Sequence, residues 1–234
     1  MSENREQISE IKRKISSLNL NEKVFDGIDL TFGQQLYERG KPKKYFESTI
    51  ELFKALGGKN IVEIGCMRAP LRHPIAELHS DCCNDGHSTY FWSLSGANVE
   101  SVDICPNAVR IARESCKEFK NCKITRGDGI KFLEYFTSRI DLLFLDAWDV
   151  DDNTAYAENH LTAYLKAKPR LNKTNIIAID DTDIGKGGKG RYLVPVLMDD
   201  GYQILVKGRQ TIALKEDGRE SRIVINGSDF ECKG

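Results

Sequence analysis

The chain has 234 residues, 40% of them hydrophobic, and 34 Lys and Arg side chains nearly balance 35 Asp and Glu side chains, for a formal net charge of −1. This length suits one α/β domain with an N-terminal extension, and the charge argues against non-specific nucleic-acid binding. No apolar run approaches the ~20 residues of a membrane-spanning helix, and the polar first residues lack a signal-peptide core. The seven cysteines, an odd number, are typical of reduced thiols. We therefore expect a cytoplasmic protein that binds neither nucleic acid nor membranes.

Residues 1–43 are expected to form a helical extension. Within residues 2–18, four apolar side chains share one helical face: Ile8, Ile11, Ile15 and Leu18. Such a face predicts a helix that packs on its own domain. The alternative is a lid or a dimerisation helix, which would allow a homodimer.

Residues 44–234 are expected to form the main domain, in which an amphipathic helix ends at Gly57 and Gly58. After it, apolar strands alternate with helices. The strands are expected at residues 60–64, 98–104, 122–126, 140–145 and 175–179, and one of the helices at residues 155–171. Two further strands, at 202–206 and 210–214, are joined so tightly that they must pair antiparallel. This order predicts an α/β fold with a Rossmann-like, doubly wound, seven-stranded sheet, mostly parallel with an antiparallel last strand.

Residues 67–84 interrupt this alternation between the first strand and Gly86. The segment is rich in Cys, His and Pro, but it shows no paired C-x₂-C spacing, and the adjacent Cys82 and Cys83 are poor partners for one tetrahedral zinc ion. We therefore expect a packed insertion rather than a metal centre in this segment.

Three successive strand ends carry acidic or small residues: Glu63-Ile64-Gly65, then Asp103, then Gly127-Asp128-Gly129. This succession resembles the motifs of class I S-adenosylmethionine-dependent methyltransferases over about residues 46–215. The resemblance implies the following cofactor-binding residues: Glu63, Gly65, Gly86, Ser88, Asp103, Ile104, Asp128, Gly129 and Asp146. Gly65 would let the backbone approach the ligand, and Asp103 would accept hydrogen bonds from the ribose hydroxyls. Ser88, at a helix N-terminus, would hold the methionine carboxylate.

A second set of acids ends the fourth and fifth strands. Asp146 follows residues 140–145, and Asp180 and Asp181 follow residues 175–179. Because neighbouring strands lie ~5 Å apart, these carboxylates can converge on one oxygen-binding cation such as Mg²⁺ or Ca²⁺. Without a cation, acids so close would repel one another.

The segment Leu145-Asp146-Ala147-Trp148, with Asp180-Asp181 later, resembles metal-dependent catechol O-methyltransferases. The resemblance implies that Asp146, Asp180 and Asp181 hold a metal that positions a substrate hydroxyl. Asp149 stands where that family has its catalytic lysine, so no general base is identified. Alternatively, Asp146 binds the ammonium of the cofactor, and Asp180 and Asp181 only cap a loop.

These observations favour a metal-assisted O-methyltransferase that acts on a small-molecule hydroxyl. Two alternatives remain, a metal-independent N- or O-methyltransferase and a non-catalytic cofactor-binding module. A nicotinamide dehydrogenase is disfavoured because no G-x-G-x-x-G follows the first strand.

Overall fold

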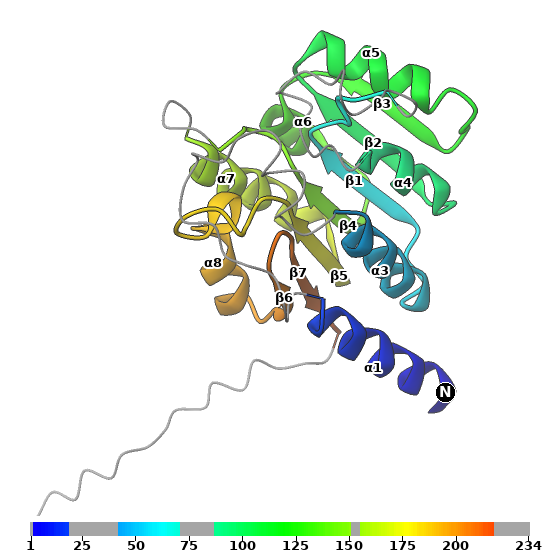
Figure 1. Cartoon of the computed structure of the whole chain (residues 1–234), viewed down its shortest axis with the longest axis vertical. Coiled ribbons are helices and arrows are strands. Elements are labelled where there is room, and N and C mark those ends of the chain that lie inside the picture. Colours follow the sequence, from blue (N-terminus) through cyan, green and yellow to red (C-terminus); the bar gives the residue numbers. More distant parts are fainter. Residues whose placement is uncertain (1, 19–41, 71–86, 151–154, 218–234) are drawn as a thin grey trace, which may run out of the picture.

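A single mixed sheet forms the centre of the molecule in a computed structural model that describes residues 2–18, 42–70, 87–150 and 155–217 (Figure 1). The strands are β1 (Asn60–Ile64), β2 (Asn98–Asp103), β3 (Cys122–Arg126), β4 (Ile140–Leu145), β5 (Leu171–Ile179), β6 (Gln203–Lys207) and β7 (Thr211–Lys215). Their spatial order is β3-β2-β1-β4-β5-β7-β6. The strands β1 to β5 pair in parallel, and β7 is antiparallel to both β5 and β6. The doubly wound, seven-stranded fold predicted from the sequence is therefore confirmed.

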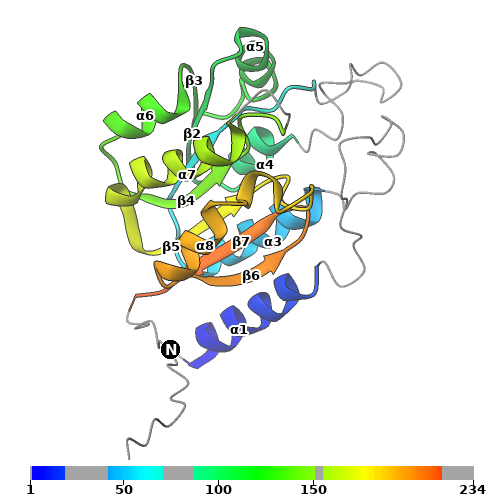
Figure 2. The same cartoon turned by 90° about the vertical axis from the view of Figure 1, so that its left-hand side faces the viewer.

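Helices cover both faces of the sheet (Figure 2). The α-helices of the described part are α1 (Ser2–Ser16), α3 (Pro42–Ala55), α4 (Ser88–Leu94), α5 (Pro106–Ser115), α6 (Gly129–Tyr135), α7 (Tyr156–Ala167) and α8 (Leu193–Asp199). Two short 3₁₀ turns accompany them, η3 (Lys168–Arg170) and η4 (Gly188–Gly190).

The strand β4 shows how the sheet separates two hydrophobic cores. Its residues Leu142 and Phe144 face the core made with α1, α3 and α4, whereas Leu143 and Leu145 face the core made with α6, α7 and α8. All four side chains are fully buried. Successive side chains of a strand point to opposite faces, so a parallel strand that is covered on both sides needs a continuous apolar run. This requirement explains why residues 140–145 form the most apolar strand of the chain.

One predicted boundary is wrong. The helix expected over residues 155–171 ends at Ala167 and continues only as η3, and β5 begins at Leu171 rather than at residue 175. Pro169 lies within η3 and cannot donate the backbone hydrogen bond that would extend α7. Leu171 is instead paired with Ile140 of β4. Residues 19–41 of the predicted N-terminal extension and residues 71–84 of the predicted insertion lie outside the described residues.

The N-terminal helix α1 packs on its own domain, as one of the two sequence interpretations expected. It contacts α3 and β6, as Figure 1 also shows, and it buries Ile11 and Ile15 in the core that holds Phe46 and Leu205. Lys12 forms an ion pair with Glu216 at 2.8 Å. The apolar face of α1 is therefore used within the chain, and a role of α1 in dimerisation stays a prediction.

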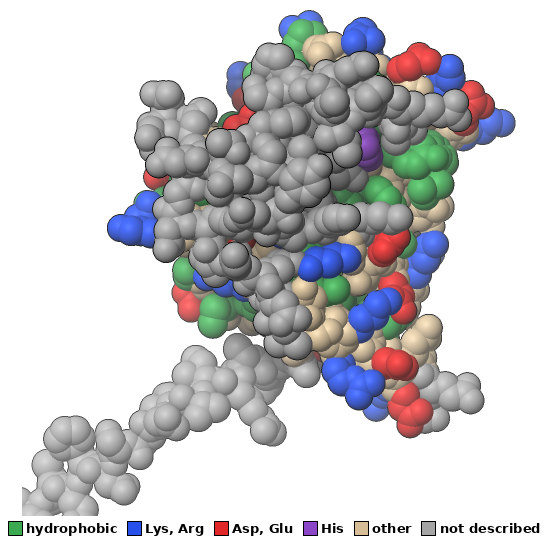
Figure 3. All heavy atoms as spheres, in the orientation of Figure 1, with side chains coloured by type: hydrophobic (Ala, Val, Ile, Leu, Met, Phe, Trp, Pro, Cys, Tyr) green, Lys and Arg blue, Asp and Glu red, His purple; other side chains and the backbone are tan. Residues whose placement is uncertain are grey.

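The surface of the described residues mixes both signs of charge. In Figure 3, lysine and arginine side chains alternate with aspartate and glutamate side chains over the coloured part of this face, which agrees with the formal net charge of −1. Within the described ranges, no helix combines the length and the apolar character needed to cross a membrane. The four cysteines of those ranges, Cys66, Cys105, Cys116 and Cys122, are free thiols.

Candidate active site

The candidate site lies where the carboxyl ends of four adjacent parallel strands meet. The order β2-β1-β4-β5 brings Asp103, Gly65, Asp146 and Asp180 to the same edge of the sheet, because each of them directly follows or ends its strand. Open α/β sheets bind their ligands at this edge. The sequence-based placement of these four residues at one edge is thus confirmed.

Gly65 is required by the contact between the ends of β1 and β4. Its φ angle is +97°, and a Cβ atom at this position would lie 2.4 Å from the backbone oxygen of Asp146. The Gly65 N–H donates to the Val102 oxygen at 2.8 Å, and the Asp146 N–H donates to the Ile64 oxygen at 2.8 Å. Only glycine combines this φ angle with such a close approach. The structure thus gives Gly65 a packing role, in addition to the ligand approach expected from the sequence.

Asp103 is fixed in place by two backbone amides. Its Oδ2 accepts a hydrogen bond from the Cys66 N–H at 2.8 Å, and its Oδ1 accepts one from the Cys105 N–H at 2.7 Å. The carboxylate therefore bridges the turn after β1 and the turn after β2, and it remains partly exposed. Each carboxylate oxygen can accept more than one hydrogen bond, so Asp103 keeps acceptor capacity for a ligand. The neighbouring Ile104 exposes 69% of its surface and offers an apolar contact beside that carboxylate.

Asp128 and Gly129 lie at the end of β3 and begin α6. The Asp128 Oδ1 accepts a hydrogen bond from the Lys131 N–H at 2.8 Å, so Asp128 is the N-cap of this helix. Gly129 is buried, and a Cβ atom there would lie 2.3 Å from the Ile64 Cγ2. Both residues therefore have structural roles that are compatible with a ligand nearby. The predicted cofactor residue Gly86 lies outside the described residues.

Glu63 lies inside the protein, on β1, rather than at the open edge. Its Oε2 accepts hydrogen bonds from the hydroxyls of Thr89 (2.6 Å) and Ser101, and the buried Ser88 hydroxyl also bonds to it. Burial raises the pKa of Glu63 to about 8, which the three hydroxyls oppose. Glu63 and Ser88 thus connect β1 with α4 and β2, and their predicted contacts with a cofactor stay predictions.

The three carboxylates at the ends of β4 and β5 do converge. Asp146, Asp180 and Asp181 each place an oxygen within 4.8 Å of the others. Asp181 has a φ angle of 49°, a left-handed conformation that aspartate tolerates better than most residues. The convergence predicted from parallel strand ends is confirmed, and we refer to these three residues as the acidic cluster.

Cations of the protein itself balance much of the charge of this cluster. The fully buried Lys189 places its Nζ 2.6 Å from Asp146 Oδ1 and 3.1 Å from Asp181 Oδ2. Arg209 places its Nη2 3.6 Å from Asp180 Oδ2 and 3.9 Å from Asp181 Oδ1. Two protein cations therefore neutralise most of the charge of three carboxylates.

Gln210 adds a neutral contact to the same cluster. Its Nε2 donates to Asp180 Oδ1 at 2.8 Å, and its side chain is fully buried. Sequence reasoning missed Lys189, Arg209 and Gln210. The one signal that could have indicated Lys189 is its place in the glycine-rich segment Gly185-Lys-Gly-Gly-Lys-Gly190, directly after the acidic strand end.

The pKa values in the cluster reflect burial and charge together. Burial raises the pKa of Asp146 to about 7; the Lys189 ammonium opposes this rise, and the carboxylates of Asp180 and Asp181 add to it. Burial alone would lower the pKa of Lys189, but the three carboxylates hold it above its usual value. Lys189 therefore remains a cation and cannot serve as a general base.

A neutral histidine lies close to the cluster. The His160 Nδ1 is 2.6 Å from the Tyr156 oxygen, and burial, with help from the charge of Lys189, lowers the pKa of His160 to about 3. The His160 ring makes an edge contact with Trp148, with 5.2 Å between ring centroids. Trp148 itself has a φ angle of 51°. Residues with such a left-handed, strained backbone often occur at functional sites.

Asp149 completes this side of the site. Its Oδ2 lies 2.8 Å from the Nη1 of Arg68, so the segment after β4 is tied to the segment after β1. The resemblance to catechol O-methyltransferases puts Asp149 where that family has its catalytic lysine, and in the structure Asp149 forms a salt bridge with Arg68.

Comparison with solved structures identifies the class of proteins that share this fold. A SAH-bound methyltransferase from Podospora anserina is 14% identical, with a TM-score of 0.54 over 89% of this chain and 87% of that chain. An O-methyltransferase from Bacillus cereus in complex with SAH is 14% identical, with a TM-score of 0.52 over 90% of this chain and 91% of that chain. A magnesium protoporphyrin IX methyltransferase from Synechocystis with bound SAM is also 14% identical, with a TM-score of 0.51 over 90% of this chain and 97% of that chain.

No protein-family model matches the chain, and no curated protein matches it in sequence. At these identities the likeness concerns the fold, and the chain has the Rossmann-like fold of these methyltransferases.

Proposed function

We propose that this protein is an S-adenosylmethionine-dependent methyltransferase. The observation that carries the proposal is the geometry of Asp103, whose carboxylate is held by the Cys66 and Cys105 amides at the end of β2. An acid at this strand end accepts hydrogen bonds from ribose hydroxyls in nucleotide-binding α/β folds. The likeness to structures that contain SAH or SAM supports a cofactor of this type.

The residues of the site fit this cofactor. Asp103 would bind the ribose, Ile104 would contact the adenine, and Asp128 with Gly129 would lie at the edge of the adenine. The cofactor, when bound, supplies a methyl group that its sulfonium already activates. The chain then has only to align an acceptor atom with that methyl group, and alignment alone can contribute a large part of the rate.

We propose a hydroxyl of a small molecule as the acceptor. The support is the acidic cluster beside the expected cofactor site, because a carboxylate accepts the hydrogen bond of a hydroxyl. Asp146 is the best placed of the three, since its side chain is 27% exposed, whereas those of Asp180 and Asp181 are 7% and 18% exposed. Asp146 would thus hold the acceptor.

A divalent metal at Asp146, Asp180 and Asp181 is the first candidate for the cation of this site. Three carboxylates within 4.8 Å are a donor set that Mg²⁺ or Ca²⁺ accepts. However, the same three carboxylates already contact Lys189 and Arg209. These contacts favour the second candidate, methylation without a metal, and the metal stays a prediction.

Exchange of Asp103 for alanine tests the proposed function. We expect the wild-type protein to bind SAM and SAH and to gain thermal stability through mass action. Asp103→Ala should weaken SAH binding by about 100-fold, because two hydrogen bonds to a charged acceptor are lost. Calorimetry measures the affinity directly. Asp199→Ala, which removes an exposed carboxylate at the end of α8, is the control and should bind as the wild type does. The proposal is wrong if NAD raises the melting temperature and the methyl donor does not.

A further inference from the structure

Lys189 is the most deeply buried charge of the site. Its side chain has no exposed surface, and its ammonium contacts carboxylates of two different strand ends, Asp146 after β4 and Asp181 after β5. An ammonium taken out of water is very costly unless it is paired. Lys189 is therefore an integral part of the cluster rather than a surface lysine that happens to reach it.

The backbone around Lys189 is built to hold it there. The Lys189 N–H donates to the Asp181 oxygen at 3.2 Å, and the Gly188 N–H donates to the Ile184 oxygen at 2.7 Å. A Cβ atom at Gly188 would lie 1.8 Å from that same Asp181 oxygen. Only glycine at this position lets the loop approach β5 closely enough to bring Lys189 into the cluster.

We infer that Lys189 is the resident cation of the acidic cluster, that it occupies the position of a divalent ion and that it excludes such an ion. A Mg²⁺ or Ca²⁺ ion needs carboxylate oxygens at about 2.0–2.6 Å. It would have to bind the carboxylates of Asp146, Asp180 and Asp181, two of which already contact the ammonium through Asp146 Oδ1 and Asp181 Oδ2. Two cations cannot share them at these distances without strong repulsion. The ammonium would have to leave, and its removal would break two buried ion pairs at once.

The charge of the cluster supports this inference. When all three carboxylates are ionised they carry three negative charges, and Lys189 with Arg209 carries two positive charges, so at most one negative charge remains. A divalent ion added to this set would leave a net positive charge in a mostly buried site. With Lys189 in place, no further cation is needed to keep the acids together.

The consequence for the reaction rests on the proposed function. Lys189 itself is buried, whereas Asp146 is partly exposed, so Lys189 acts through Asp146 as a positioning residue. It fixes the Asp146 carboxylate with one oxygen turned to the ammonium. The other oxygen is then left to meet the acceptor hydroxyl, and metal chelators should not affect methyl transfer.

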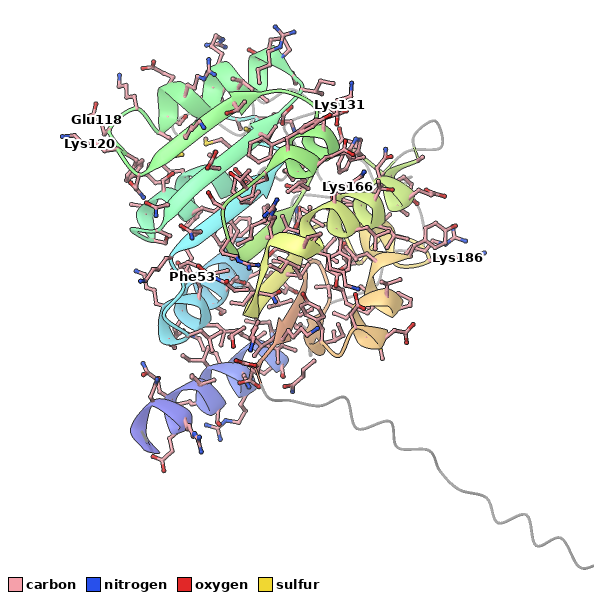
Figure 4. The ribbon with its side chains drawn as sticks, turned by 180° about the vertical axis from the view of Figure 1, so that it is seen from behind. Phe53, Glu118, Lys120, Lys131, Lys166 and Lys186 are labelled. Carbon is pink, nitrogen blue, oxygen red and sulfur yellow. The ribbon has the colours of Figure 1, made fainter. Side chains whose placement is uncertain are left out.

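Titration with Mn²⁺, followed by electron paramagnetic resonance, tests the inference. Wild type, Lys189→Gln and Lys186→Gln are each titrated without and with saturating SAH. Lys186 lies on the same loop, is exposed and projects away from the molecule (Figure 4), so its exchange removes a lysine charge outside the cluster. We expect no saturable Mn²⁺ binding below millimolar concentration in the wild type or in Lys186→Gln. In Lys189→Gln, one Mn²⁺ site should appear, with an affinity at least about tenfold higher than that of the wild type, because one positive charge about 3 Å from the carboxylate oxygens is gone.

Each outcome decides the inference. One Mn²⁺ bound tightly by the wild type, with the same affinity in Lys189→Gln, overturns it. If Lys189→Gln does not fold, the wild type decides alone, because a stoichiometric metal site there contradicts the exclusion and its absence supports it. Asp180→Asn in the Lys189→Gln background should remove the new site. Failure of SAH to bind the wild type would reject the proposed function, whereas the titration without SAH would still decide the role of Lys189.

Discussion

Replacement of Gly188 by alanine is expected to lower the free energy of unfolding by about 4 kcal/mol, a large value for one methyl group. The added Cβ would lie 1.8 Å from the Asp181 backbone oxygen, and that oxygen also accepts the hydrogen bond of the Lys189 N–H. The loop must move away from β5, which strains the buried ion pairs of Lys189. The left-handed backbone of Gly188, with φ +47°, adds about 1–2 kcal/mol for an alanine.

Gly185→Ala separates the two causes of that loss. Gly185 belongs to the same loop and has nearly the same backbone angle, φ +51°, but beyond its chain neighbours no atom lies within 4 Å of the position that an alanine methyl group would take. This variant should lose only about 1–2 kcal/mol, the cost of the left-handed backbone. Urea unfolding of both variants measures the difference. Equal losses would mean that the close contact between the loop and Asp181 is absent in solution.

The sequence predicted the sheet well because the local signals agree with the global arrangement. Residues 140–145 are apolar at every position that the two cores require, and each strand end carries a glycine or an acid. The error at residues 168–171 has a local cause as well, since Pro169 is a helix-stop signal that the expected helix over residues 155–171 did not take into account. The choice between helix and strand there depends on pairing with Ile140, which no local pattern shows.

The candidate site was predictable only in part, for a physical reason. Asp146 and Asp180 could be predicted to lie close together because both follow the ends of neighbouring parallel strands, and strand geometry fixes where their side chains start. Lys189 lies 43 residues after Asp146, in a glycine-rich loop with no periodicity, and such loops are ordinarily exposed. Arg209 lies in the tight connection between β6 and β7, where a charged residue usually meets water. The two cations that decide the electrostatics of the cluster were therefore missed.

The second large effect is expected from Glu63, which should make the free energy of unfolding depend on pH. Burial raises its pKa from the ordinary value of 4.5 to about 8 in the folded protein. Between these two values the folded state binds a proton that the unfolded chain releases. The free energy of unfolding should therefore fall as the pH rises from about 4.5 to about 8, and the contribution of Glu63 should no longer change above about pH 8. Between pH 6 and pH 9, Glu63 alone should account for a loss of about 3 kcal/mol.

Glu63→Gln should abolish that loss, because the amide cannot ionise but can still accept hydrogen bonds from Thr89 and Ser101. Urea unfolding of wild type and variant at pH 6 and pH 9 gives the measurement, and the difference between the two pH slopes isolates Glu63 from other titrating groups. Glu100→Gln is the control, since Glu100 lies on the neighbouring β2 and pairs with Lys123 at the surface; it should keep the wild-type slope. Identical slopes in wild type and Glu63→Gln would show that water reaches Glu63 and that its carboxylate is not sealed between β1, β2 and α4.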